Sequence, residues 1–255
     1  MKKNTLILLL AYNIASAQSI VEIEKELLYN FTQLNRFTIE GENISDSLAF
    51  YNKQLSEKIL KYASSSKEML NYTFPNIGAQ YWTIATSPDS KFRIYSWDTQ
   101  ASGSMRFYNN IFQWKDYDTL YAKKNEIEEG MPGGFYSQIF QLTDELNTFY
   151  MCYFNSVLSN RDCYQAIHCM DFERKVFNKE FKKIKTKSGT NFKLGFSFDW
   201  NSVKYLKEYP YKLIKFNSTT NTIVIPVVNT EGKVSSKSIF YKYDGDYFVK
   251  ETVKK

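Results

Sequence analysis

The chain of 255 residues has little of the material from which most catalytic and metal sites are built. It contains one histidine, three cysteines, ten glycines and five prolines. A lone histidine makes a Ser-His-Asp or Cys-His arrangement hard to assemble, and its spacing from the cysteines matches no common zinc-ligand pattern. There is no G-x-S-x-G elbow. Gly130–Gly134 lacks the lysine and Ser/Thr of a phosphate-binding loop, so we interpret it as a turn. We expect no cofactor.

Arginine is scarce as well. The formal net charge is +6, yet only five of the 33 basic residues are arginine. Proteins that bind nucleic acids concentrate arginine and lysine on one face and use arginine for paired contacts. Here the lysines are scattered and often alternate with apolar residues, as in 181–185, which is typical of the solvent-facing side of a strand. We therefore expect no nucleic-acid partner.

Residues 1–17 have the pattern of a cleavable export signal. Lys2 and Lys3 precede a short apolar run, Leu6–Ala11, and small residues follow at 15–17. The apolar run is much shorter than the roughly 20 residues that span a bilayer, and no longer run follows. We expect cleavage after Ala17, no membrane span in the mature chain, and a periplasmic or extracellular location.

Residues 18–75 show helical periodicity. Ser19 and Glu22 match a capping box at a helix start, and Glu40-Gly41-Glu42-Asn43 separates this helix from a second one that begins near Ser45. Apolar residues recur at helical spacing in both stretches: Ile23, Leu27, Phe31 and Leu34, then Leu48, Leu55, Ile59 and Tyr62. This pattern predicts a helical hairpin whose apolar faces pack on each other or on a sheet. A stripe left uncovered would indicate a role in assembly with a partner.

In residues 76–255 the period changes to two, and short turns join the predicted strands without intervening helices. The predicted strands are 80–87, 91–98, 104–114, 117–123, 135–142, 147–157, 163–172, 191–199, 211–216, 221–228, 236–243 and 246–252. Asp244-Gly245 predicts a two-residue hairpin turn. The expected fold class is α+β and β-dominated: a helical hairpin followed by an antiparallel meander, forming one unit. A sandwich or curved sheet is favoured, with a small β-propeller as the alternative.

The three cysteines, Cys152, Cys163 and Cys169, fall in one predicted hairpin. If its loop is Ser159–Asp162, Cys152 lies opposite Cys169. Because an exported protein meets an oxidising compartment, a Cys152–Cys169 disulfide is one hypothesis. A register shifted by one residue, or free buried cysteines, are the alternatives. His168 and Cys169 are neighbours on a strand and point to opposite faces, so they cannot form a nucleophile–base pair. We interpret His168 as a structural histidine.

Residues 91–114 combine two of the five arginines with several aromatic residues. Within the first strand, Arg93, Tyr95 and Trp97 share a face, and Arg106 and Tyr108 share a face of the next. A guanidinium can stack on aromatic rings or bind a carboxylate or phosphate. The ligand-binding candidates are therefore Arg93, Tyr95, Trp97, Asp98, Arg106 and Tyr108. The interpretation we favour is internal packing, in which Arg93 or Arg106 pairs with Asp98 and stacks on Trp97.

The same region resembles a known group of sequences. Tyr95-Ser96-Trp97-Asp98-Thr99, Gly103-Ser104-Met105 and Asn109–Gln113, together with Tyr243–Phe248, resemble a group of uncharacterised secreted proteins of Bacteroidota-type bacteria. The resemblance covers about the last two-thirds of the chain. It implies export, and it brings no activity and no functional residues with it.

The function expected from the sequence is that of an exported, non-catalytic binding or interaction protein. Its partner would be a peptide, a glycan or another envelope component, as suggested by the export signal and by the 17% aromatic content. The alternative is a hydrolase of envelope polymers, which needs two carboxylates at a fixed separation. The candidates are Asp98, Asp116, Asp118 and Glu126, and no spacing selects a pair. A buried carboxylate with a raised pKa in an acidic cleft would favour the enzyme.

Overall fold

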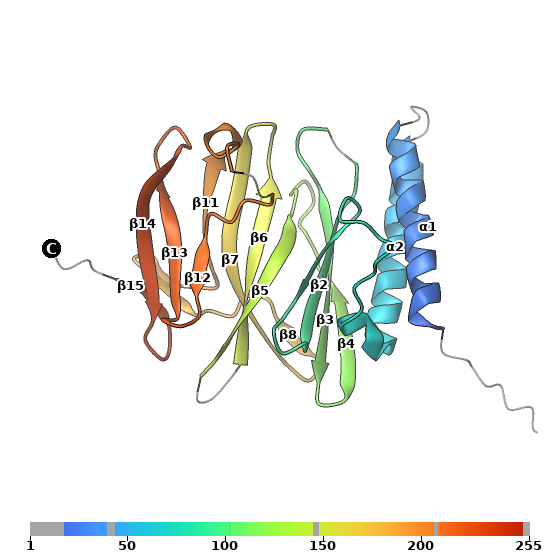
Figure 1. The fold of residues 1–255 in the computed structure, drawn as a ribbon, viewed down its shortest axis with the longest axis horizontal. Helices are drawn as coiled ribbons and strands as arrows, with labels where there is room; N and C mark the ends of the chain where they lie inside the picture. The colour runs from blue at the N-terminus through green and yellow to red at the C-terminus, as the bar shows by residue number, and fades with distance from the viewer. Residues whose placement is uncertain (1–17, 40–43, 102, 145–147, 207–208, 252–255) are drawn as a thin grey trace, which may run out of the picture.

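The computed structural model describes residues 18–39, 44–101, 103–144, 148–206 and 209–251. Four layers lie side by side: a helical layer and three sheets stacked behind it (Figure 1). The predicted α+β, strand-dominated class is confirmed. The sheets are open and stacked in layers, not arranged as blades around an axis, so the propeller alternative is wrong. The predicted signal at 1–17 and the break at 40–43 lie outside the described residues.

The helical layer consists of α1 (Ile20–Ile39) and α2 (Ile44–Ser65), followed by a short 3-10 turn at Lys67–Leu70. The capping box forms as predicted: the Ser19 backbone N–H donates to the Glu22 carboxylate at 3.0 Å, and the Glu22 N–H donates to Ser19 Oγ at 3.3 Å. All eight residues of the two predicted apolar stripes are buried. Within the described ranges, neither helix is both long and apolar enough to cross a bilayer.

The outer faces of the helices carry few large apolar side chains. Val21, Tyr29 and Phe50 are exposed, but charged and polar residues such as Lys25 and Thr32 separate them along the outer face. Scattered exposed apolar residues are normal on a protein surface. The helical hairpin therefore packs on the sheet, and the idea of an assembly stripe loses its support.

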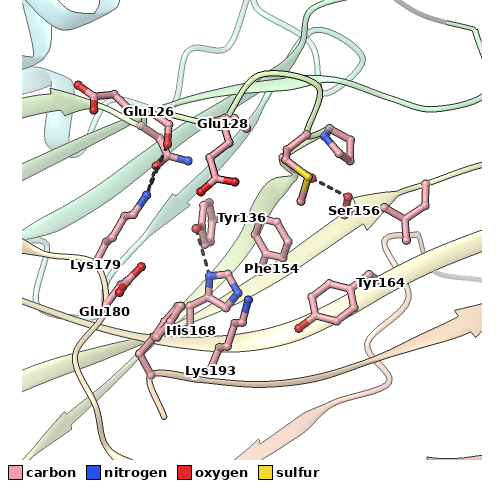
Figure 2. Close-up of a pocket in the computed structure, with 17 residues that line it drawn as sticks. Glu126, Glu128, Tyr136, Phe154, Ser156, Tyr164, His168, Lys179, Glu180 and Lys193 are labelled. Atoms are coloured by element: carbon pink, nitrogen blue, oxygen red, sulfur yellow. Dashed lines mark hydrogen bonds between the residues drawn. The ribbon is translucent and has the colours of Figure 1, made fainter.

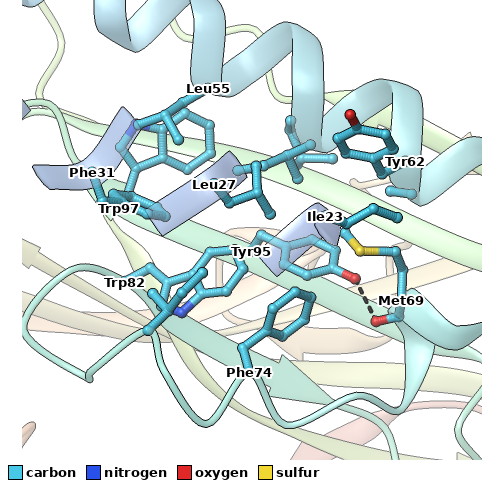
Figure 3. Close-up of a cluster of buried hydrophobic side chains, with 14 of the residues drawn as sticks. Ile23, Leu27, Phe31, Leu55, Tyr62, Met69, Phe74, Trp82, Tyr95 and Trp97 are labelled. Carbon is cyan, nitrogen blue, oxygen red and sulfur yellow. Dashed lines mark hydrogen bonds between the residues drawn. The ribbon is translucent and has the colours of Figure 1, made fainter. Parts of the chain in front are cut away.

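The first sheet has the order β1-β2-β3-β4, with β1 (Thr83–Thr86), β2 (Phe92–Asp98), β3 (Tyr108–Asp116) and β4 (Thr119–Lys124), all antiparallel. Its strands alternate between two buried faces, as the period of two predicts. Tyr95, Trp97 and Ile111 face the helices (Figure 3), whereas Phe92, Ile94 and Phe112 face the second sheet.

The second sheet has the order β11-β7-β6-β5. It comprises β5 (Phe135–Thr143), β6 (Thr148–Val157), β7 (Asp162–Glu173) and β11 (Lys193–Asp199), with the short strand β8 (Val176–Asn178) paired to β7. Tyr150 and Cys152 on β6 point toward the first sheet, and Phe149, Met151 and Tyr153 point toward the third. β2 and β6 thus lie in the interior with both faces covered.

The third sheet has the order β10-β9-β15-β14-β13-β12. Its strands are β9 (Ile184–Thr186), β10 (Gly189–Asn191), β12 (Lys215–Asn217), β13 (Thr222–Val228), β14 (Val234–Tyr243) and β15 (Phe248–Lys250). β15 runs parallel to β9, an exception to the antiparallel prediction, and the short strands β8, β9 and β10 were not predicted. The turn at Asp244-Gly245 is longer than predicted: Tyr243 pairs with Phe248, so four residues separate the strands.

The predicted register of the β6–β7 hairpin is wrong by one residue. Cys152 lies opposite His168, and Cys169 lies opposite Met151. A slip of one residue moves a side chain to the other face of a strand. Cys152 therefore faces the first sheet and Cys169 the third. The predicted Cys152–Cys169 disulfide is not formed, and both residues, together with Cys163, are free and buried.

We expect three free thiols in the purified protein. Burial raises the pKa of Cys163 to about 11 and that of Cys169 to about 12, so all three thiols should resist alkylation in the folded state. Intact mass after iodoacetamide treatment without reductant should show three adducts in denaturant and almost none in native buffer. Fewer than three adducts in denaturant would indicate that a disulfide is present.

Candidate functional site

The structure does not bring the six predicted ligand-site residues into one place. Arg93, Tyr95 and Trp97 share a face, as predicted, but α1, α2 and the segment 66–82 cover that face. Arg93 is only 6% exposed. Its Nη1 donates to the Met69 carbonyl at 2.5 Å and to the Tyr72 carbonyl at 2.8 Å. Arg93 and Tyr95 are buried under this cover, so the structure does not support a ligand site at these two residues. Trp97 is buried as well, but it also lines a surface hollow beside Asp98.

These three side chains join the first sheet to the layer above it. Arg93 Nε donates to Thr86 Oγ1 at 2.7 Å, and its guanidinium lies 5.7 Å from the centre of the Tyr95 ring. Trp97 Nε1 donates to Asn52 Oδ1 on α2 at 3.0 Å. Arg93 is therefore packed internally, but its hydrogen-bond partners are Thr86, Met69 and Tyr72 rather than Asp98, and its aromatic partner is Tyr95 rather than Trp97.

The other three predicted residues lie beyond the cover of the helices. Arg106 Nη1 is 3.4 Å from Asp98 Oδ2, the pairing that the packing alternative named. The Gln100 N–H donates to Asp98 Oδ1 at 2.8 Å. Burial raises the pKa of Asp98, while the Gln100 N–H and Arg106 oppose that rise. The Tyr108 ring packs on Phe135 at a centroid distance of 5.1 Å. These residues line two adjoining hollows at the surface.

A separate pocket opens over the part of the second sheet that the first sheet leaves uncovered (Figure 2). Cys152, Phe154 and Ser156 lie on one face of β6, and His168 lies on the same face of β7 because it pairs with Cys152. Cys152 is covered by the first sheet, whereas the others line a cavity of about 480 Å³. The segment 125–134, which joins β4 to β5, forms the opposite wall. The Gly130–Gly134 turn of the sequence is thus part of a pocket.

Two glycines allow the walls to approach this closely. A Cβ at Gly195 would lie 2.6 Å from the Tyr164 hydroxyl and 2.6 Å from Ala166 Cβ, and one at Gly134 would lie 2.4 Å from the Phe154 ring. Side-chain carbons are not found at such distances, so any other residue would push the aromatic rings aside. Glycine at both positions keeps Tyr164 and Phe154 flat against the cavity.

His168 forms the floor of the pocket and is stacked on an aromatic ring. Its ring lies 4.5 Å from that of Phe154 with an interplanar angle of 16°. Tyr136 and Phe192 meet it edge-on at 5.8 and 5.9 Å. Nδ1 lies 3.3 Å from the Tyr136 hydroxyl. Nε2 is buried and has no hydrogen-bond partner among the described residues. The structural interpretation of His168 therefore accounts for only one of its two nitrogens.

Burial also fixes the charge of His168. It lowers the pKa of the imidazole to about 3, with smaller contributions from the positive charges of Lys193 and Lys179. Lys193 lies directly opposite His168 on β11, and Lys179 Nζ donates to Asn125 Oδ1 at 3.2 Å. The imidazole is therefore neutral at physiological pH, with charged side chains around the mouth of the pocket: Glu126, Glu128, Lys179, Glu180 and Lys193.

The proposed carboxylate pair of a hydrolase does not assemble. Asp98 and Glu126 line different cavities, and Asp116 accepts a hydrogen bond from the Arg174 N–H at 2.6 Å. Asp118 is exposed and pairs with Lys67 and Lys115, which lower its pKa. Among the described residues, no group of three or more His, Cys, Asp and Glu side chains is placed to hold a metal ion.

We expect Arg93→Ala to destabilise the fold strongly. The change removes the donor to the Tyr72 carbonyl and one of the two donors to the Met69 carbonyl, which keeps the Tyr95 hydroxyl. It also removes the packing of the guanidinium inside the helix–sheet interface, and each buried unsatisfied acceptor costs about 1–3 kcal/mol. Urea denaturation should show a loss of about 3 kcal/mol or more in the free energy of unfolding. Arg174→Ala, at an exposed position, is the control and should change stability by less than about 0.5 kcal/mol. Equal stability of the two variants would contradict the packing role.

Comparison with known proteins adds no further constraint on the site. The chain matches no model of a known protein family and no curated protein sequence. Its function therefore has to be argued from the pocket around His168 and from the hollows beside Asp98.

Proposed function

We propose that this chain is an exported, non-catalytic binding protein whose ligand occupies the pocket around His168. One observation carries the proposal: His168 lines an aromatic cavity, and its buried Nε2 has no hydrogen-bond partner among the described residues. Leaving such a group unpaired costs about 1–3 kcal/mol. Native proteins retain few groups of this kind, and a ligand that pairs with Nε2 recovers the cost on binding.

The hydrogen-bond network indicates which kind of group Nε2 needs. Burial raises the pKa of the Tyr136 phenol, so its hydroxyl keeps its proton. The contact described for that hydroxyl is with His168 Nδ1. We assign the phenol as donor in this contact because the reverse arrangement would leave the phenol hydrogen unpaired in addition to Nε2. The neutral imidazole then carries its proton on Nε2. The ligand is accordingly expected to present an acceptor, such as a carbonyl oxygen, to the floor of the pocket.

The walls define the remainder of the ligand. A cavity of about 480 Å³ lies within the range of small-molecule sites, which are mostly apolar with a few placed polar groups. The rings of Tyr136, Phe154, Tyr164 and Phe192 line it. These features favour a compact ligand that is flat or apolar and carries one buried acceptor, such as the acylated end of an envelope component.

The same geometry supports binding more than catalysis. A general base is most effective when its pKa lies near the working pH, and the pKa of His168 is about 3. The Ser156 hydroxyl donates to the Gly133 carbonyl at 2.6 Å and therefore lacks the adjacent base that would activate it. Asp98, a partly buried carboxylate with a raised pKa, meets one criterion for an envelope-polymer hydrolase. No second carboxylate among the described residues lines the same hollows, so the pair that such an enzyme uses is not present there.

Export is part of this proposal and rests on the pattern of residues 1–17 and on the resemblance to secreted proteins. Expression in an export-competent bacterial host should yield a chain that begins at Gln18, because small residues precede the expected cleavage site. The intact mass of the exported protein measures this directly. A chain recovered only in the cytoplasm and at full length would contradict export and leave the pocket unaffected.

The pocket is tested with two probes of similar shape, acetophenone and isopropylbenzene, which differ in the carbonyl acceptor. We compare their affinities for the natural protein and for His168→Phe, which keeps a ring against Phe154 and removes the donor. The preference for acetophenone should fall about tenfold in the variant, corresponding to about 1.4 kcal/mol. Since His168 stays neutral well above pH 3, the preference should be the same at pH 5 and pH 8.

Titration by ¹H–¹⁵N NMR gives both affinities and locates the probes. Tyr117→Phe, at an exposed position that does not line the pocket, is the control and should leave both affinities unchanged. Two results would count against the proposal: probe shifts outside the pocket residues, or an unchanged preference in His168→Phe.

A further inference from the structure

A surface groove lies close to the His168 pocket on the other side of β6. Two hollows of about 710 and 420 Å³ share four lining residues, Asp98, Gln100, Tyr108 and Tyr209, and so form one groove. Successive residues at the end of β6 and just after it point alternately to the His168 pocket and to the groove. Ser156 and Leu158 line the pocket, and Val157 and Ser159 line the groove. The groove is therefore a separate site, independent of the proposed function.

We propose that this groove binds a neutral saccharide through the Asp98–Arg106 pair and the Tyr209 ring. The first argument concerns the aromatic wall. Tyr209 is 57% exposed, and its ring is braced by Trp200 at 5.4 Å, Tyr211 at 5.9 Å and Phe135 at 6.4 Å. An aromatic ring that is held from behind and open in front offers a flat apolar surface with a polar edge. The C–H face of a pyranose ring fits such a surface.

The second argument concerns the polar pair beside this wall. The Arg106 side chain is 42% exposed and that of Asp98 is 21% exposed, and their closest contact is a long 3.4 Å. A carboxylate only accepts hydrogen bonds, and a guanidinium only donates them. A sugar hydroxyl does both, so one hydroxyl can donate to Asp98 and accept from Arg106. Two adjacent hydroxyls of one sugar ring could form hydrogen bonds with Asp98 and Arg106 at the same time.

Charge defines the ligand class. Arg106 and Asp98 neutralise each other, so a charged ligand gains attraction from one partner and repulsion from the other. The pair therefore favours a neutral, hydroxyl-rich ligand over an acidic sugar. Asp98 is the only carboxylate among the described residues that line the two hollows. Since glycoside hydrolysis uses two carboxylates at a fixed separation, the site binds and does not cleave.

The test uses four neutral trisaccharides, namely cellotriose, maltotriose, mannotriose and chitotriose, with trigalacturonic acid as the acidic comparison. Saturation-transfer NMR detects binding, and isothermal titration calorimetry measures it. We expect at least one neutral trisaccharide to bind in the millimolar range or tighter, and more tightly than trigalacturonic acid. A ligand concentration of about 10 mM is high enough to detect dissociation constants in the millimolar range. If none of the four neutral trisaccharides binds at this concentration, the proposal is overturned. Tighter binding of trigalacturonic acid would overturn it as well.

Variants locate the bound sugar. Tyr209→Ala removes the stacking surface, and Asp98→Asn keeps the acceptor for the Gln100 N–H while removing the charge. Each should weaken binding about tenfold or more, with a melting temperature near that of the natural protein. Tyr205→Ala is the matched control because Tyr205 is 74% exposed and does not line the groove. Equal losses in Tyr205→Ala and Tyr209→Ala would mean unspecific stacking and overturn the site.

The two proposed binding sites can be tested separately. His168→Phe should leave saccharide affinity unchanged, and Tyr209→Ala should leave the affinity for acetophenone unchanged. Loss of saccharide binding in His168→Phe would show that the groove is not a separate site.

Discussion

The structure depends on strands that bury both of their faces. β2 gives Tyr95 and Trp97 to the helical layer and Phe92 and Ile94 to the second sheet. β6, in the second sheet, does the same between the first and third sheets. Each of these strands therefore contributes side chains to two hydrophobic clusters, one on each face. A displacement of the strand backbone changes the packing of both clusters. Arg93 fits into this arrangement because its guanidinium donates to the carbonyls of Met69 and Tyr72 above the sheet and to Thr86 Oγ1 on β1, which ties the first sheet to the segment that covers it.

Much of this fold could be read from the sequence, because helical and strand periodicities are local. The capping box, both helical stripes and most strands lie where they were predicted. The disulfide prediction failed on one residue of register: Leu158 belongs to the loop and Val157 pairs with Cys163. Turn geometry sets the register, and it is not encoded in the alternation itself.

The candidate sites were harder to predict for a related reason. Alternation indicates which side chains share a face, but not what covers that face. Arg93, Tyr95 and Trp97 were correctly grouped and then buried by helices more than 25 residues earlier in the chain. The His168 pocket exists because the first sheet covers only part of the second, which is a long-range property. The local signals were a lone histidine on an apolar strand and the Gly130–Gly134 turn, and neither alone indicates a cavity.

The third sheet imposes an order on the assembly of the molecule. β9 and β10 form a hairpin of three-residue strands whose other neighbour in the sheet is β15, about sixty residues further along. Phe248 on β15 is fully buried against the second sheet. A nascent chain therefore cannot complete this layer until residues 248–250 have been synthesised, because the hairpin has no edge to join before then.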